Sequence, residues 1–252
     1  MVTGHSTTLA IEPWLTVTYR PTSLFSLRMT HATSKGGKTL LVPTPYAFKV
    51  ALIDACFRMF ATSEAPGRAR QVFDLVKGRA VRFRPPRYCV VQNTFIKIKQ
   101  EERGSPKGIY ASTIAYREYV HYEGLLEVAV SVAGIEDEQV QTIAALATRI
   151  NYLGKRGSFL QFIGFEVRHD PLPRGFTCPE SEADLVNGGY GATHYLDEFG
   201  QALVDDTDGF ERVNSYGSKP SALGKYRVLV PTMLPYRYRT SSRHFTCFEL
   251  ID

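Results

Sequence analysis

The feature that most constrains the fold is a strongly apolar segment of helical character at residues 46–61. Pro45 precedes it, and proline suits the first turn of a helix because the N–H that it lacks has no partner there. Apolar residues occupy most sides of this helix: Phe48, Val50, Ala51, Leu52, Ile53, Cys56, Phe57, Met59 and Phe60. A helix that is apolar nearly all round is buried, so we expect it to pack against a sheet.

Segments in which apolar and polar residues alternate predict the strands of that sheet. In the first segment Leu15, Val17 and Tyr19 share one face, because successive side chains of a strand point to opposite faces. A second helix is predicted over 137–152, where apolar residues recur at amphipathic spacing behind an acidic first turn. The predicted strands are 9–19, 80–84, 88–99, 112–122, 125–132 and 158–167. We expect 112–122 and 125–132 to pair around Glu123 and Gly124.

In coarse outline, these elements follow the order strand, helix, strand, strand, helix, strand. That order is typical of the ferredoxin-like (RRM-type) βαββαβ core, an α+β fold with two helices on one face of an antiparallel sheet. We assign residues 1–168 to this core, with a basic loop, an arm or thumb, inserted at about 20–44. Residues 169–252 are expected to form a β-rich C-terminal elaboration packed on the core, with 225–230 and 245–250 as a final strand pair.

The charge of the chain is unevenly distributed. The formal net charge is +5, yet residues 68–107 contain 11 Lys and Arg against 3 acidic residues, and residues 178–214 contain 9 acidic residues against one Arg. A basic segment that forms strands can follow a phosphate backbone. The alternative is a solvated charged face. The acidic segment is expected to face protein or solvent rather than RNA.

Two short loops combine glycines with cations. The first is Gly154-Lys155-Arg156-Gly157, and the second is Lys35-Gly36-Gly37-Lys38. Glycine permits close backbone approach, and adjacent cations beside free amides suit phosphate binding. For the first loop the alternative is a helix C-cap at Gly154. For the second loop the alternative is a mobile surface loop.

Cations alternate with aromatic residues in the basic middle of the chain. Arg82, Arg84 and Arg87 flank a Pro-Pro turn, and Lys97 and Lys99 share a strand face with Phe95. RNA recognition needs both cations for phosphates and ring faces for unstacked bases. A charged sheet edge that prevents aggregation is the alternative. A similar Tyr/Arg group occurs at Tyr236–Arg239, with Arg243 and His244 following it.

No motif for a metal, a cofactor or nucleophilic catalysis stands out. The four cysteines form no CxxC pair, and HExxH, GxGxxG, Walker and GxSxG patterns are absent. We therefore expect no cofactor and no metal, and assign no catalytic residue. A metal-independent ribonuclease would need a general base and a cation for the developing charge. Only His31, near Lys35 and Lys38, offers that combination, and the signal is weak.

The N-terminus lacks the pattern of a signal peptide, and no apolar stretch approaches 18 residues. We therefore expect a cytoplasmic protein without a membrane span.

Two segments resemble the RAMP superfamily of CRISPR-associated proteins, and within it the Cas-five family. They are the Pro-led helix start at 41–55 and the Gly/basic loop with its following strand at 150–162. The resemblance covers about residues 9–167. It implies an RRM-like domain with a protruding thumb that holds the crRNA 5′ handle in a Cascade ribonucleoprotein. It also implies contacts with the backbone and large subunits, and with target DNA indirectly through the complex. By position, Gly36–Lys38 would lie in an arm and Gly154–Gly157 in the glycine-rich loop.

Three hypotheses follow. The first is a crRNA-binding, non-catalytic subunit of a type I CRISPR Cascade complex in antiviral defence. The second is a metal-independent endoribonuclease that processes precursor crRNA. The third is a small-molecule enzyme on a ferredoxin-like scaffold, which the fold alone does not exclude. The predicted RNA-binding residues are Lys35, Gly36, Gly37, Lys38, Arg82, Arg84, Arg87, Lys97, Lys99, Gly154, Lys155, Arg156 and Gly157.

Overall fold

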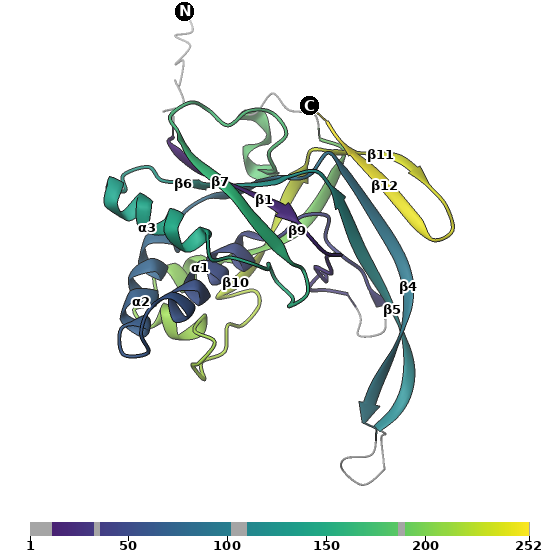
Figure 1. Cartoon of the computed structure of the whole chain (residues 1–252), viewed down its shortest axis with the longest axis horizontal. Coiled ribbons are helices and arrows are strands. Elements are labelled where there is room, and N and C mark those ends of the chain that lie inside the picture. The colour runs from purple at the N-terminus through teal and green to yellow at the C-terminus, as the bar shows by residue number, and fades with distance from the viewer. Residues whose placement is uncertain (1–11, 33–35, 102–109, 186–189, 252) are drawn as a thin grey trace, which may run out of the picture.

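The computed structural model describes residues 12–32, 36–101, 110–185 and 190–251. The protein is a mixed α/β structure whose named strands form three sheets. The main helices gather on one side of the molecule, and a long two-stranded hairpin projects from the other side (Figure 1).

The first sheet has four strands in the order β3-β6-β1-β7, and every pairing in it is antiparallel. The strands are β1 (Trp14–Pro21), β3 (Val81–Arg84), β6 (Leu126–Ser131) and β7 (Leu160–Arg168). The alternation predicted for β1 is observed: its Leu15, Val17 and Tyr19 side chains are buried in the main core. This sheet forms one wall of that core.

Helix α1 (Pro45–Met59) is the apolar helix predicted from the sequence. Thr44 caps its N-terminus, where the Thr44 Oγ1 accepts a hydrogen bond from the Ala47 N–H at 3.1 Å. Pro45 occupies the first turn as expected. Phe48 and Leu52 of α1 are fully buried in the same core as β1.

Two further helices pack against α1. These are α2 (Ala65–Val76) and α3 (Asp137–Ala147). The hydroxyl of Tyr19 in β1 donates to the carbonyl of Ala147 at 2.8 Å, which ties the end of α3 to the four-stranded sheet. No helix in the described ranges is both long and apolar enough to span a membrane.

The second sheet has five strands in the order β11-β12-β4-β5-β2. They are β2 (Gly36–Gly37), β4 (Tyr88–Glu101), β5 (Tyr110–Glu123), β11 (Tyr236–Ser241) and β12 (Phe245–Leu250). Strands β4 and β5 pair along their whole length and form the projecting hairpin seen in Figure 1.

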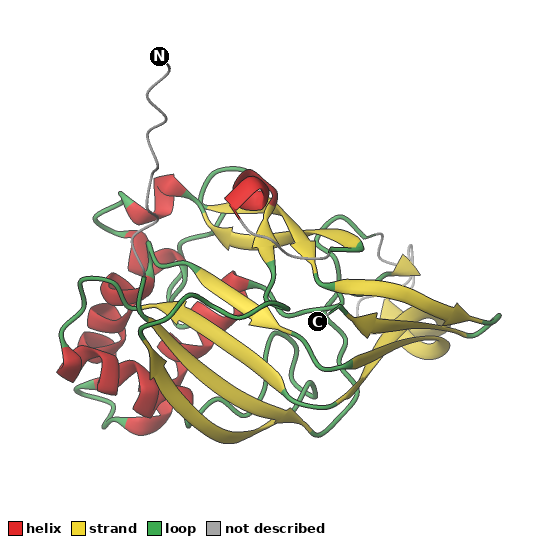
Figure 2. Cartoon of the chain, turned by 90° about the horizontal axis from the view of Figure 1, so that it is seen from above, coloured by secondary structure: helices red, strands yellow, loops and turns green. Residues whose placement is uncertain are grey.

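The third sheet has the order β8-β10-β9, with β8 (Cys178–Pro179), β9 (Ala192–Phe199) and β10 (Arg227–Leu234). Figure 2 shows that most helices lie at one end of the molecule, while the strands extend to the other end. The remaining helical elements are η1 (Glu180–Leu185), α4 (Gln201–Val204) and η2 (Gly209–Arg212).

Both predicted strand pairs are wrong, although the strands themselves exist. β5 pairs with β4 and β2, whereas β6 pairs with β1 and β3, so no hairpin joins them. Gly124, with φ of +118°, lies where the chain passes from one sheet to the other. Similarly, β10 pairs with β8 and β9, and β12 pairs with β11 and β4. In both cases the two strands predicted to pair lie in different sheets.

Candidate nucleic-acid interface

A cleft of about 400 Å³ opens where six parts of the chain meet. They are the loop after β1, strand β2, the residues at the start of α1 and just before it, strand β5, the turn before β7, and strand β9. The residues that line the cleft are Ser26, Leu27, Arg28, Gly37, Leu40, Thr44, Tyr46, Ala47, Arg117, Gly154, Lys155 and Asp197. The two glycine-containing loops predicted from the sequence therefore meet at one site.

The Gly154–Gly157 turn is held rigidly at the cleft. The Ser23 hydroxyl donates to the carbonyl of Gly157 at 2.6 Å and accepts from the N–H of Phe159 at 2.7 Å. Gly154 and Gly157 have φ of +70° and +103°, values that residues other than glycine rarely adopt. Between them, the side chains of Lys155 and Arg156 are exposed. The turn thus presents two cations beside a fixed backbone.

The alternative of a helix C-cap at Gly154 is wrong. Helix α3 ends at Ala147 with Thr148 as its cap, and Gly154 lies six residues beyond Thr148. The positive φ of Gly154 instead belongs to the turn that precedes β7. A Cβ atom at this position would lie 3.1 Å from a methyl group of Leu27, so the turn packs closely on the loop after β1.

The second glycine loop is anchored to β5. Gly36 and Gly37 pair in parallel with Tyr116 and Arg117. A Cβ at Gly37 would lie 2.8 Å from the Cδ of Arg117, so this glycine leaves the space that the arginine occupies. Lys35, predicted to contribute a cation, lies outside the described residues.

Glu118 fixes the end of that loop. Its carboxylate forms an ion pair with Lys38 and accepts from the N–H of Thr39 at 2.8 Å. The Glu118 side chain is buried, while that of Lys38 reaches the surface. The charge of Lys38 is therefore compensated locally, which leaves it a weaker candidate for phosphate binding than Lys155 or Arg156.

Two cleft arginines were missed in the sequence. Arg28 donates to the carbonyl of Ala32 at 2.6 Å, and Arg117 donates to that of Tyr116 at 2.7 Å. Arg28 belongs to no motif, so no local signal marks it. Arg117 follows Tyr116 in a predicted strand. The same combination of an aromatic residue and cations in a strand indicated Phe95, Lys97 and Lys99, so this signal could have identified Arg117.

The projecting hairpin carries the predicted mixture of cations and aromatic rings. Phe95 lies opposite Tyr116, with ring centroids 4.2 Å apart and planes at 71°. Phe95 is 65% exposed and Tyr116 is 46% exposed. Lys97 and Lys99 follow at alternate positions and are exposed. We call this surface the hairpin face; it offers open ring surfaces next to positive charges.

The remaining predicted arginines do not line the cleft. Arg82 binds Glu182 through both carboxylate oxygens at 2.8 Å, and Arg84 pairs with Glu127 at 3.0 Å. Arg87 is exposed and lies over the ring of Tyr88. Arg82 and Arg84 thus hold elements of the fold together.

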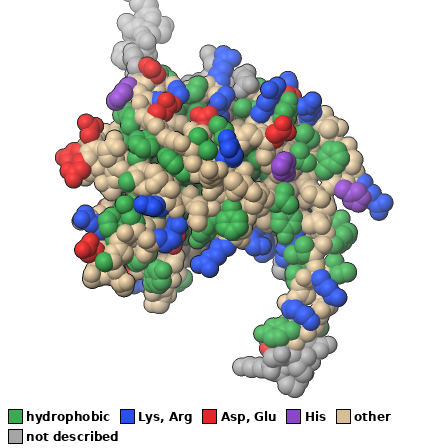
Figure 3. Space-filling view, in the orientation of Figure 1, with side chains coloured by type: hydrophobic (Ala, Val, Ile, Leu, Met, Phe, Trp, Pro, Cys, Tyr) green, Lys and Arg blue, Asp and Glu red, His purple; other side chains and the backbone are tan. Residues whose placement is uncertain are grey.

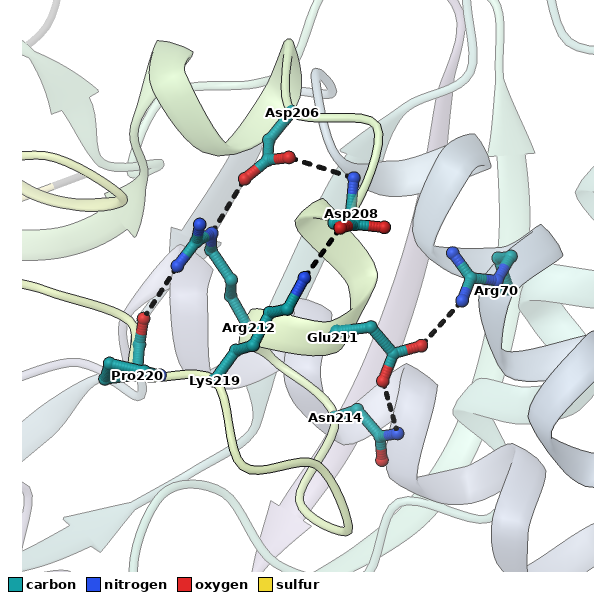
Figure 4. A network of polar contacts seen from close by, with 8 residues as sticks. All are labelled: Arg70, Asp206, Asp208, Glu211, Arg212, Asn214, Lys219 and Pro220. Carbon is teal, nitrogen blue, oxygen red and sulfur yellow. Dashed lines mark hydrogen bonds and ion pairs between the residues drawn. The ribbon is translucent and has the colours of Figure 1, made fainter.

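The acidic segment is compensated by nearby cations (Figure 4). Three ion pairs of 2.6–2.7 Å do this: Asp206 with Arg212, Asp208 with Lys219, and Glu211 with Arg70. The last pair joins η2 to α2. The acidic residues in Figure 4 therefore hold the C-terminal part together and against the helices.

Two histidines, His31 and His194, come from segments that also line the cleft. His31 is exposed, and Lys38, one of the two cations predicted to assist it, is paired with Glu118. His194 accepts from the Leu41 N–H at 3.4 Å, and burial lowers its pKa to about 4. Within the described ranges, no three His, Cys, Asp or Glu side chains gather as metal ligands would.

No family model matches the sequence. A curated relative, "CRISPR-associated protein Cas5" of Archaeoglobus fulgidus, is 23% identical over 159 residues. The match covers 63% of this chain and 66% of that protein, so the chain spans about two thirds of its relative's length. This match confirms the resemblance to CRISPR-associated Cas-five proteins that the sequence indicates.

Two solved structures are similar over most of the chain. The first, titled "Crystal structure of a CRISPR protein from Archaeoglobus fulgidus", has a TM-score of 0.45 and 11% identity, and the match covers 94% of this chain and 92% of that one. A chain of a "CRISPR RNA-guided surveillance complex" has a TM-score of 0.37 and 14% identity, with 88% and 90% covered.

Proposed function

We propose that this chain is a crRNA-binding subunit of a type I CRISPR Cascade effector complex and holds the 5′ handle of the crRNA. The observation that carries the proposal is the cleft in which the Gly154–Gly157 turn meets Gly37, Arg28 and Arg117. The sequence match to a protein named Cas5 supports it.

The chemistry of the cleft suits a phosphate backbone. Gly37 and Gly154 let backbone and ligand approach closely, and Arg28, Arg117 and Lys155 supply positive charge around them. The cleft is also lined by Leu27, Leu40 and Asp197, and the Asp197 carboxylate is paired with Arg227 at 3.2 Å. Three cations beside two glycines favour a polyanion as the ligand. The hairpin face adds exposed rings on which unstacked bases can lie.

The ferredoxin-like core remains part of this proposal. Its members would be β1, α1, β3, β6, α3 and β7, which follow one another as strand, helix, strand, strand, helix, strand. The sheet order β3-β6-β1-β7 supports this assignment. In this arrangement the β4–β5 hairpin is an insertion between the second and third core strands and acts as the thumb. Residues 20–44 instead contribute to the cleft.

Residues 169–252 would then be the elaboration packed on the core at 1–168. Two contacts between these parts support the packing of one on the other. β12 pairs with β4, and Lys49 in α1 binds Glu198 in β9 at 2.8 Å. We further propose that the surfaces left open contact the backbone and large subunits of the complex in the cytoplasm, and target DNA through that complex.

Binding of a repeat-derived RNA to the full chain tests the proposal. We expect Lys155→Ala/Arg156→Ala to weaken binding and to lower the slope of log affinity against log salt by about 1.4, which is about 0.7 for each lost phosphate contact to a single strand. The matched control is Arg68→Ala/Lys77→Ala, which removes one cation from α2 and one from the residue that caps its C-terminus. Equal effects of the two variants, or no RNA binding by the parent chain, would refute the proposal.

The same RNA, labelled and incubated with the chain in EDTA, separates binding from cleavage. We expect intact RNA, because the charge of Lys38, one of the two cations predicted to assist His31, is compensated by Glu118. Cleavage that His31→Ala abolishes would favour the metal-independent endoribonuclease instead.

A further inference from the structure

A second basic surface lies on the five-stranded sheet, and the cleft does not use it. It is formed by Arg87, Tyr88, Arg237 and Arg239, which we call the Arg face. The register places Arg237 opposite Glu249 of β12, and Glu249 opposite Tyr88 of β4. Residues directly opposite each other share a sheet face, so these side chains lie together although they come from distant parts of the sequence.

Two guanidinium groups converge on the ring of Tyr88. The Cζ atoms of Arg87 and Arg239 lie 5.2 Å and 4.9 Å from its centre. Among the described residues neither arginine forms an ion pair, whereas Arg237 pairs with Glu249 at 3.0 Å. Arg239 also hydrogen-bonds the side chain of Tyr88. A guanidinium group has five N–H donors, so one such bond leaves others that can bind a phosphate.

The Arg face is well separated from the cleft. β11 and β2 are the two edges of the sheet order β11-β12-β4-β5-β2, and Gly37 of the cleft lies in β2. Tyr88 of the Arg face lies two strands from β2, but Gly37 pairs with Arg117, which lies opposite Thr94 and not opposite Tyr88. The stretch of β4 from Tyr88 to Thr94 spans roughly 20 Å at about 3.3 Å per residue. Figure 3 shows Lys and Arg side chains gathered in the region of β11 and β12, at the upper right of the view.

We propose that the Arg face binds the phosphates of a nucleic-acid duplex. The ring of Tyr88 is already covered by guanidinium groups and is not available to stack on an unpaired base. A duplex keeps its bases stacked inside and presents phosphates, which is what this surface can bind. Phe95 and Tyr116 on the hairpin face are open, which suits a single strand.

The composition of the surface favours nucleic acid over a protein partner. Protein interfaces usually have an apolar centre depleted of charge and a polar rim. The centre of the Arg face is instead a tyrosine covered by two cations. This proposal goes beyond the binding of crRNA in the cleft and does not depend on it.

The test measures binding of the full chain to a short duplex DNA and to a single-stranded RNA across a range of salt concentrations. For Arg87→Ala/Arg239→Ala we expect the duplex salt slope to fall by about 1.8, from about 0.9 for each phosphate contact, while RNA binding is little changed. Arg239→Ala alone should lower the slope by about 0.9. Arg68→Ala is its matched control, because Arg68 also lies over a ring, that of Phe60, but on α2.

An unchanged duplex slope in the double variant overturns the proposal, as does an equal loss for duplex and RNA. Binding of an acidic protein but not of the duplex would also overturn it. Arg87→Lys/Arg239→Lys guards against misfolding: it keeps the charge but not the planar fork, and it should retain more duplex binding than the alanine pair. The cleft variant Lys155→Ala/Arg156→Ala should affect RNA instead, so failure of the two proposals can be told apart.

Discussion

At the scale of single residues, Gly37 and Arg117 pack closely against each other in the cleft. The space that a side chain at Gly37 would fill is taken by the Cδ of Arg117 at 2.8 Å. Because an arginine side chain is flexible, it can move aside without disturbing the backbone. The position of one cleft cation therefore depends on a glycine in another strand.

We predict that Gly37→Ala weakens RNA binding by several-fold, because it displaces Arg117, while the free energy of unfolding changes by less than about 1 kcal/mol. Gly67→Ala is the control, since a Cβ there meets nothing within 4 Å. That variant should bind RNA like the parent chain. Titration of labelled RNA together with urea denaturation checks both statements; equal affinities for the two variants would contradict the role given to Gly37.

His194 gives the fold a dependence on pH. Burial lowers its pKa to about 4 from an ordinary value of 6.5. Between these values the unfolded chain binds a proton that the folded chain does not, so stability falls as the pH falls from about 6.5 to about 4. Linkage limits this loss to about 3 kcal/mol.

We predict that His194→Asn, which retains an acceptor for the Leu41 N–H, lacks this part of the pH dependence. Denaturation curves at pH 7, 5.5 and 4.5 measure it. The control is His169→Asn, because His169 is exposed. If the parent chain and His194→Asn lose stability in parallel on acidification, the low pKa of His194 is wrong.

At the scale of elements, the β4–β5 hairpin combines a local pattern with a long-range position. Its strand alternation puts Phe95, Lys97 and Lys99 on one face, as expected from the sequence. Phe95 and Tyr116 contact each other but bury little of their surface in the core. The two rings therefore contribute little to the stability of the core, and their exposed surfaces are available for a ligand.

We predict that Phe95→Ala weakens binding of single-stranded RNA by about 1–3 kcal/mol, the usual contribution of one stacked base. The thermal midpoint should change little, because the ring is largely exposed. Thr94→Ala, on the opposite face of the same strand, is the control. Unaltered RNA affinity in Phe95→Ala would remove the hairpin face from the interface.

A buried ion pair joins α1 to β9. The Nζ of Lys49 lies 2.8 Å from Glu198, and the Lys49 side chain is only 2% exposed. Burial lowers the pKa of Lys49, and Glu198 opposes that shift. The amine also donates to the carbonyl of Lys77 at 3.3 Å.

We predict that Glu198→Gln lowers the free energy of unfolding by about 3 kcal/mol, because it leaves a buried cation without its counter-charge. Replacing both partners, as in Lys49→Met/Glu198→Leu, should cost less than this single change. Glu180→Gln, at an exposed site, is the control. Chemical denaturation measures all three; a double variant less stable than Glu198→Gln would contradict the explanation.

The helices and strands could be predicted because their signals are local, whereas their pairing could not. Residues 110–123 and 126–131 look like a hairpin around Gly124, yet they enter different sheets. The same limit applies to the site. Arg82 and Arg84 have the alternation of a binding strand, but Glu182 and Glu127, distant in sequence, neutralise them. Arg28 reaches the cleft only because its loop folds against the Gly154–Gly157 turn.

At the scale of the whole molecule, one group of charged residues forms ion pairs within the fold, and another group of cations does not. Acidic residues of the C-terminal part are paired with cations around η2 and α2. The cations that form no ion pair among the described residues include Lys155 at the cleft and Arg156 beside it, Lys97 and Lys99 on the hairpin, and Arg87 and Arg239 on the Arg face. Under the two proposals, one surface binds a single strand and a separate surface binds a duplex.

The most direct test of the central claim is photo-crosslinking of a repeat-derived RNA to the full chain, followed by identification of the crosslinked residues by mass spectrometry. We predict crosslinks at Tyr46 in the cleft and at Phe95 or Tyr116 on the hairpin face, all lost when unlabelled RNA is added in excess. Crosslinks confined to other parts of the chain, or none at all, would contradict the assignment of the cleft and the hairpin as the RNA-binding surface.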